Sequence, residues 1–214
     1  HIGELDKAVE TARQAVELSV ENKYPVSCVA SHIFYALCLS FKGLDQQVLD
    51  VCKNYNERFY DHKNPTFYVV YINILSETAK GDLAAAKALV VDLCNSEYDF
   101  ATGWYIHFIA KKHLQRGEFD EAIELMELSL AKSTDNCEVA AIPIVKNTLA
   151  LALYKKNNEV TPRINSLLST SLELAIEQKA PQINPRSTMA TISGLYPVLR
   201  LLFSRFAVDT QGKR

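Results

Sequence analysis

A turn-forming residue recurs at nearly even intervals along this chain of 214 residues. Glycines stand at Gly3, Gly43, Gly81 and Gly117, with separations of 40, 38 and 36 residues. A further step of 40 reaches Asn157, and asparagine, like glycine, tolerates the left-handed conformation in which many helices end. Basic residues directly precede the last four positions and acidic residues soon follow, as suits the ends of successive helices. We therefore predict a break between two helices at each position.

Apolar residues at helical spacing fill the stretches between these breaks. Predicted helices that follow a break span about 4–22, 45–60, 82–96, 118–132 and 160–179. Those that precede a break span about 27–42, 66–80, 101–116 and 139–156. The stretch 67–75, FYVVYINIL, has a strand-like composition, but its place before Gly81 favours a helix. Pro143 either delays the start of its helix or kinks it.

Two helices per unit of 36–40 residues are typical of a helical solenoid. We expect an all-α fold, a right-handed superhelical array of antiparallel helix pairs over residues 1–180. Residues 181–208 depart from the pattern and are expected to form capping helices, followed by a tail at 209–214. An apolar stripe marks the capping segment: Leu195, Val198, Leu199, Leu202, Phe203 and Phe206.

At this level of detail the chain resembles the tetratricopeptide (TPR) family over roughly residues 3–180. That family has a small residue seven before the turn glycine and an alanine five after it. The first position holds Ala36, Ala110 and, before Asn157, Ala150, while Ile74 departs. The second holds Ala8, Ala86 and Ala122, while Val48 departs. The longer repeat and the polar residues Asn73 and Glu77 at usually apolar positions indicate a divergent, TPR-like array.

More narrowly, the chain is similar to the helical-repeat regions of large bacterial signalling regulators. These include transcription activators of the maltose type and adenylate cyclases that carry an ATPase-like module. The similarity lies in AVETARQAVELSVENKYPVS (8–27), ALCLSFKG (36–43) and GWYIHFIAKKHLQRGEFDEAIELM (103–126). The resemblance implies a sensing or scaffolding segment without catalytic residues of its own. The odd count of cysteines in apolar settings indicates reduced thiols and a cytoplasmic location. Because the first repeat begins in mid-motif, we expect the chain to be a piece of a longer protein.

Reaction chemistry finds no support in the motifs. The five cysteines match no zinc spacing, and we expect reduced thiols in apolar helical settings. His107 and His113 are six residues apart, on different sides of a helix, and no phosphate-binding loop occurs. The acidic residues of 118–127 are typical of a solvated helix face. We therefore predict no enzyme activity, no cofactor and no metal, and no stretch of 18 apolar residues indicates a membrane partner.

Net charge is −2, with +5 in residues 155–214 and −7 before them, and no long basic run indicates nucleic-acid binding. The helices that precede the breaks would line the concave face of a TPR-like array, where aromatic and polar residues hold a partner. The candidate groove residues are Tyr68, Asn73, Trp104, Tyr105, Lys111 and Lys112. An alternative for the aromatic residues is packing in the core.

The predicted function is therefore non-catalytic binding of a protein, a peptide or a small inducer, with the other domains of the full-length chain as further partners. The alternative is assembly, in which the apolar C-terminal stripe forms a homodimer.

Overall fold

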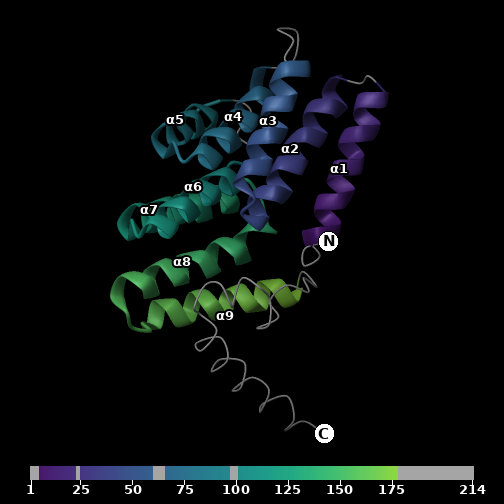
Figure 1. Ribbon diagram of the computed structural model, residues 1–214. Helices are drawn as coiled ribbons and strands as arrows, with labels where there is room; N and C mark the ends of the chain where they lie inside the picture. The colour runs from purple at the N-terminus through teal and green to yellow at the C-terminus, as the bar shows by residue number, and fades with distance from the viewer. Residues whose placement is uncertain (1–4, 23–24, 60–65, 97–100, 178–214) are drawn as a thin grey trace, which may run out of the picture.

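The computed structural model describes residues 5–22, 25–59, 66–96 and 101–177, and the regular secondary structure of these ranges is entirely helical (Figure 1). The helices are α1 (Leu5–Glu21), α2 (Pro25–Lys42), α3 (Asp45–Phe59), α4 (Thr66–Lys80), α5 (Leu83–Cys94), α6 (Thr102–Arg116), α7 (Phe119–Asp135), α8 (Ala141–Asn157) and α9 (Pro162–Glu177). The all-α prediction is confirmed, and FYVVYINIL lies within α4.

Each helix packs against the next one in the chain, from α1 through α9. The even-numbered helices also pack against one another, α2 on α4, α4 on α6 and α6 on α8. Figure 1 shows this succession, with the helix pairs following one another from α1 to α9. The even-numbered helices therefore form a connected row that the odd-numbered helices flank.

The turns that end α2, α4 and α6 share one geometry. Gly43, Gly81 and Gly117 have φ values of 73°, 83° and 78°. At the first of these turns, the Gly43 amide donates to the Ser40 carbonyl, and the Leu44 amide donates to the Leu39 carbonyl. This pair of bonds is the Schellman motif, which satisfies the last carbonyls of a helix when its C′ residue is left-handed. The predicted breaks at these glycines are confirmed, while Gly3 lies outside the described residues.

Two further helices end on left-handed residues that are not glycine. Asn157 was predicted to be the turn residue, but it is the last residue of α8, and Asn158 adopts φ 53°. Helix α7 runs three residues past its predicted end and stops before Cys137, which has φ 56°. Cys137 is exposed in this turn, which corrects the prediction that every cysteine lies in an apolar helical setting. Pro143 falls in the first turn of α8, where its missing N–H is tolerated.

Small residues occupy the crossings between helices. Seven of the eight residues named above at positions seven before or five after a turn are fully buried: Ala36, Ile74, Ala110 and Ala150 before the turn, and Val48, Ala86 and Ala122 after it. Ala8, the eighth, is half-buried in α1. The closest crossing joins α6 to α7 at Gly103, where an added Cβ would lie 2.0 Å from Ser133 Oγ and 3.1 Å from the Ser129 carbonyl. The Ser129 hydroxyl donates to the Gly103 carbonyl at 2.7 Å. Glycine is therefore required there for the two backbones to approach.

Charged side chains before three of the turns reach the preceding repeat, whereas Lys80 bonds to Glu77 within its own helix. Lys42 bonds to Asp6 and Lys156 bonds to Asp120, in each case across 36 residues. Arg116 takes the equivalent place before its glycine and donates to the Gly81 carbonyl at 2.6 Å. Because most of these side chains are exposed, each contact adds little stability, but together they favour one register between successive pairs.

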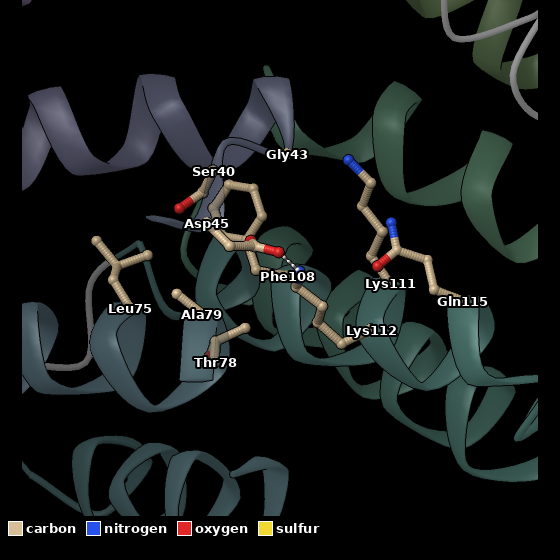
Figure 2. A pocket seen from close by; sticks show the side chains of 10 residues that line it. All are labelled: Ser40, Gly43, Asp45, Leu75, Thr78, Ala79, Phe108, Lys111, Lys112 and Gln115. Atoms are coloured by element: carbon tan, nitrogen blue, oxygen red, sulfur yellow. Dashed lines mark hydrogen bonds and ion pairs between the residues drawn. The ribbon is translucent and has the colours of Figure 1, made fainter. Parts of the chain in front are cut away.

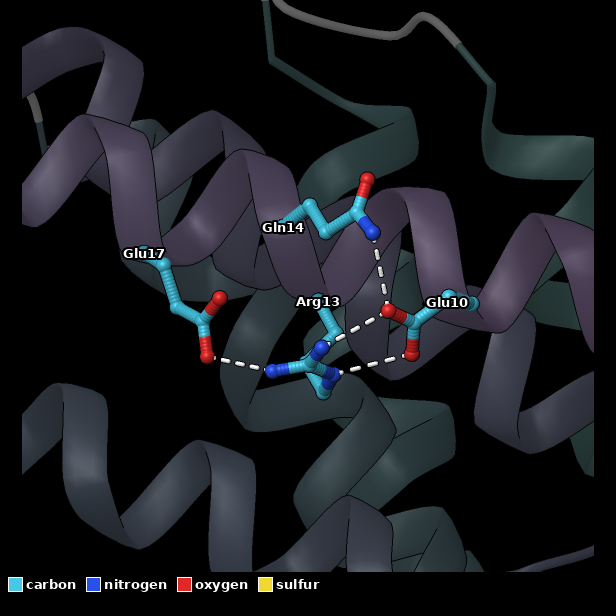
Figure 3. A network of polar contacts seen from close by, with 4 residues as sticks. All are labelled: Glu10, Arg13, Gln14 and Glu17. Atoms are coloured by element: carbon cyan, nitrogen blue, oxygen red, sulfur yellow. Dashed lines mark hydrogen bonds and ion pairs between the residues drawn. The ribbon is translucent and has the colours of Figure 1, made fainter.

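A second kind of ionic contact stays within one helix. Figure 3 shows Arg13 of α1 between Glu10 and Glu17, with Gln14 donating to Glu10 at 2.9 Å. These residues are one helical turn apart and exposed, so they support the helix without fixing its neighbours.

Helix α2 is long and apolar enough to cross a membrane by length and composition alone. In this structure it packs against α1, α3 and α4, as a core helix also does. The expectation of no membrane partner stays a prediction. The capping helices at 181–208, the tail and the apolar C-terminal stripe lie outside the described residues.

The turn geometry predicts opposite effects for two substitutions. Cys137→Gly should raise the free energy of unfolding by roughly 0.5–1 kcal/mol, because glycine relieves the left-handed strain at some entropic cost. Gly117→Ala, the matched control, should lower it by about 1–2 kcal/mol. Urea unfolding followed by circular dichroism measures both changes. A loss of stability in Cys137→Gly would contradict this account of the turn.

Candidate binding site where α2, α3, α4 and α6 meet

An aromatic cluster joins the end of α2 to α6, although three helices separate them in the chain. The Phe41 ring meets the Trp104 ring edge-on at a centroid distance of 5.1 Å and an angle of 83°. It also meets the Phe108 ring at 4.8 Å and 72°. Edge-to-face pairs of this kind are favourable beyond the area that they bury. The first and third helix pairs therefore touch directly at this face.

The neighbouring residue on α6 lies in the core. Tyr105 stacks on Tyr71 of α4 at a centroid distance of 4.9 Å and is 2% exposed. Burial raises the pKa of Tyr105 well above its usual value. Successive residues of a helix point about 100° apart, and position 105 faces α4 rather than solvent. This corrects the prediction that Tyr105 lines a groove.

The other aromatic and amide candidates are half-buried. Trp104 packs against Phe41 as described above, and Tyr68 of α4 packs against the hydrophobic core. Asn73, also on α4, is half-buried as well. None of the three is fully exposed, so a partner would reach only their edges.

The two lysine candidates differ in their partners. Lys112 of α6 forms an ion pair with Asp45, the first residue of α3, across 67 residues. Within the described ranges Lys111 forms no ion pair or hydrogen bond. Burial lowers the pKa of Lys111, and the charge of Lys112 lowers it further, while Asp45 acts in the opposite direction. Lys112 is thus ion-paired, whereas Lys111 is half-buried without an ion pair in the described ranges.

A small pocket lies beside these lysines (Figure 2). Its lining residues are Ser40, Gly43, Asp45, Leu75, Thr78, Ala79, Phe108, Lys111, Lys112 and Gln115. In Figure 2 the Lys111 side chain runs in a different direction from the joined Asp45 and Lys112 side chains. The free volume of about 20 Å³ holds about one water molecule. The pocket therefore accommodates a single polar group, not a whole small molecule.

The remaining titratable groups offer no competing site within the described ranges. No group of three or more His, Cys, Asp or Glu side chains there is arranged to hold a metal ion. His107 is buried, and burial lowers its pKa to about 3, so the ring is neutral. His113 Nδ1 lies 2.5 Å from Glu118 Oε2, across the turn at Gly117.

The acidic residues of α7 have partners that local spacing does not reveal. Arg116 and Lys132 are their nearest basic residues in the sequence. Instead, Asp120 pairs with Lys156 and Glu127 with Arg163, one repeat further along. Phe41 and Asp45 likewise belong to the candidate site, although neither is among the predicted groove residues. The repeat period would identify contacts 36 residues apart, but no sequence signal identifies the contact between the first and third pairs.

Comparisons with known proteins find only short similarities. No family model matches the chain, and no solved structure matches it. The UvrABC system protein A of Treponema pallidum is 48% identical over 44 residues, 21% of this chain and 5% of that protein. The protein of the same name from Rickettsia bellii is 43% identical over 47 residues, 22% of this chain and 5% of that protein. The matched stretch thus spans about 5% of the length of these relatives and assigns no activity to the chain.

The aromatic cluster predicts a specific spectroscopic change. Phe41→Ala should shift the fluorescence emission of Trp104, the one tryptophan of the sequence, to longer wavelength. The reason is that removal of the Phe41 ring exposes the indole to water. We also expect a loss of about 1–3 kcal/mol in the free energy of unfolding, below the usual range because Phe41 is only half-buried.

Phe34→Ala is the matched control, since Phe34 lies on the same helix and is 63% exposed. It should leave emission and stability unchanged. Equal effects of the two substitutions would contradict the contact between Phe41 and Trp104.

Proposed function

We propose that this chain is a non-catalytic binding segment, built as a TPR-like right-handed array of helix pairs. The proposal is supported by the sequential packing of the helices, the connected row of even-numbered helices, and the left-handed turn after α2, α4 and α6. It is also supported by the small residues buried before and after the turns. Arrays of this kind offer one continuous face formed by the same helix of every pair.

The observation that carries the proposal is the environment of Lys111. Its side chain is half-buried beside a second lysine, and Asp45, the carboxylate that lines the same pocket, is bonded to that second lysine. Holding a cation in this way costs stability unless a negative group compensates it. A carboxylate from a partner would supply that compensation at Lys111.

The shape of the site favours a partner that lies across the surface. The pocket holds about one water molecule, so it would admit one carboxylate oxygen and exclude an enclosed inducer. The half-buried rings of Trp104 and Tyr68 lie on the same row of helices and would contact apolar parts of an extended segment. We therefore infer that the partner is a protein segment with an acidic side chain.

In a larger bacterial signalling or transcriptional regulator, such a segment would serve as a sensor or scaffold. Binding would favour one arrangement of the helix pairs and pass that state to the adjoining domains. This part of the proposal rests on the resemblance in residues 8–27, 36–43 and 103–126.

The test uses an array of acidic peptides, each paired with its Asn or Gln counterpart, probed with the full chain. Peptides that bind only in the acidic form are then measured against Lys111→Met. We expect at least about a tenfold loss of affinity, as for a residue that dominates an interface. Absence of any peptide that discriminates acid from amide would contradict the proposal.

Stability separates the functional role of Lys111 from a structural one. A lysine whose pKa is lower in the folded chain than in the unfolded chain destabilises the fold fully below its folded pKa. This cost declines as pH rises from the folded pKa towards the unfolded pKa. At neutral pH, Lys111→Met should therefore raise the unfolding midpoint while it weakens binding. Lys112→Met, the matched control, should lower the midpoint because it leaves Asp45 unpaired. A lower midpoint in Lys111→Met would show that the amine serves the fold.

A further inference from the structure

A second recess lies on the other side of α6, between α5 and α7. It has a volume of about 250 Å³, and its lining residues are Lys87, Val90, Val91, Cys94, Asn95, Ile106, Ile109, Leu125, Leu128 and Lys132. Ile106 and Ile109 of α6 are buried and form its floor, while Val91 and Leu128 on the flanking helices are 50% and 42% exposed. The recess is therefore an open apolar groove with room for one or two large side chains.

The repeat explains why this groove stays open. The odd-numbered helices of the described ranges share no extensive contact with one another. Between α7 and α9 an ion pair of Glu127 with Arg163 spans the gap. In the preceding repeat, Val91 of α5 stands at the position that corresponds to Glu127. Glu127 itself stands at the position that corresponds to Arg163, and it is already paired with Arg163. The gap between α5 and α7 therefore lacks this ion pair and presents apolar side chains instead.

The charges at the groove indicate what would fill it. Its two charged lining residues, Lys87 of α5 and Lys132 of α7, are both cationic, and none of the acidic residues that the structure describes lines it. Lys132 has another interaction of its own, whereas the Lys87 side chain is exposed. A segment with apolar side chains flanked by carboxylates is complementary to this arrangement. The apolar C-terminal stretch of this chain carries Arg200 and Arg205, so its charge does not match.

We propose that the groove between α5 and α7 docks an amphipathic helix of another protein, with apolar residues on one face and Asp or Glu beside them. Apolar side chains of α5, α6 and α7 line one groove, and such a groove can bind the apolar face of a helix. The site is separate from Lys111, which lies at the junction of α6 with α2 and α3. The two sites would allow this segment to hold two partner segments at once.

The test selects peptides from a phage-displayed random library on the full chain and measures the selected peptides as synthetic ligands. We expect sequences with apolar residues at i, i+3 or i+4 and with acidic flanks. Their affinity should fall at least about tenfold for Leu128→Asp, as for loss of an apolar anchor. Lys87→Glu should weaken acidic peptides and improve their lysine-substituted counterparts.

Three controls keep the result specific. Phe34→Asp places the same charge on an exposed apolar position of α2 and should leave binding unchanged. Lys111→Met should also leave it unchanged, so failure here is distinguishable from failure of the function proposed above. Circular dichroism of Leu128→Asp should match that of the unaltered chain, because Leu128 is substantially exposed.

Several outcomes would overturn the proposal. These are selection of no peptides, selection of basic peptides, or affinities that Leu128→Asp does not change. A fourth contradicting outcome comes from sedimentation. If the unaltered chain is a dimer and Leu128→Asp is a monomer, the groove is occupied by a second copy and not by a partner helix.

Discussion

The left-handed residue that ends each even-numbered helix is the constraint on which the rest of the structure depends. A helix that stops in a Schellman turn reverses direction within two residues, so the next helix begins at once and packs back against it. At Gly43, Gly81 and Gly117 this reversal carries no steric cost. The same turn sets the basic residue before it in reach of the preceding pair, as Lys42 and Arg116 illustrate. Regular turns thus produce regular contacts one repeat apart.

Much of the fold could be predicted from this one pattern. The bounds of α2, α4 and α6 follow from the glycines, and the buried alanines follow from their fixed distance to the turn. The pattern failed where another residue adopts the glycine conformation. Cys137 ends α7 in the left-handed region without any signal in its residue type, and Asn158 rather than Asn157 ends α8. At α8 the residue type was right and its position was one residue off, whereas at α7 the residue type gave no indication of the turn.

The candidate site was less predictable, for a geometric reason. Helical spacing places side chains on a face, but it does not say which element that face meets. Tyr105 was assigned to a surface and lies in the core, because its side of α6 is covered by α4. Trp104 meets Phe41 two pairs away, where the ends of α2 and α6 come together beside α4. Such a contact depends on the sum of all intervening helix crossings, which no single stretch of sequence encodes. The same holds for Lys111, which has no ion pair in the described ranges because Asp45 pairs with Lys112 instead.

The most direct test of this account is the contact between the first and third helix pairs. Because the sequence has a single tryptophan, its indole protons are unambiguous in an NMR spectrum of the labelled chain. The account predicts nuclear Overhauser effects from the Trp104 indole to the Phe41 ring, whose centroids lie 5.1 Å apart. Absence of these effects in a chain that keeps its helices, and that shows those between Tyr71 and Tyr105, would contradict it.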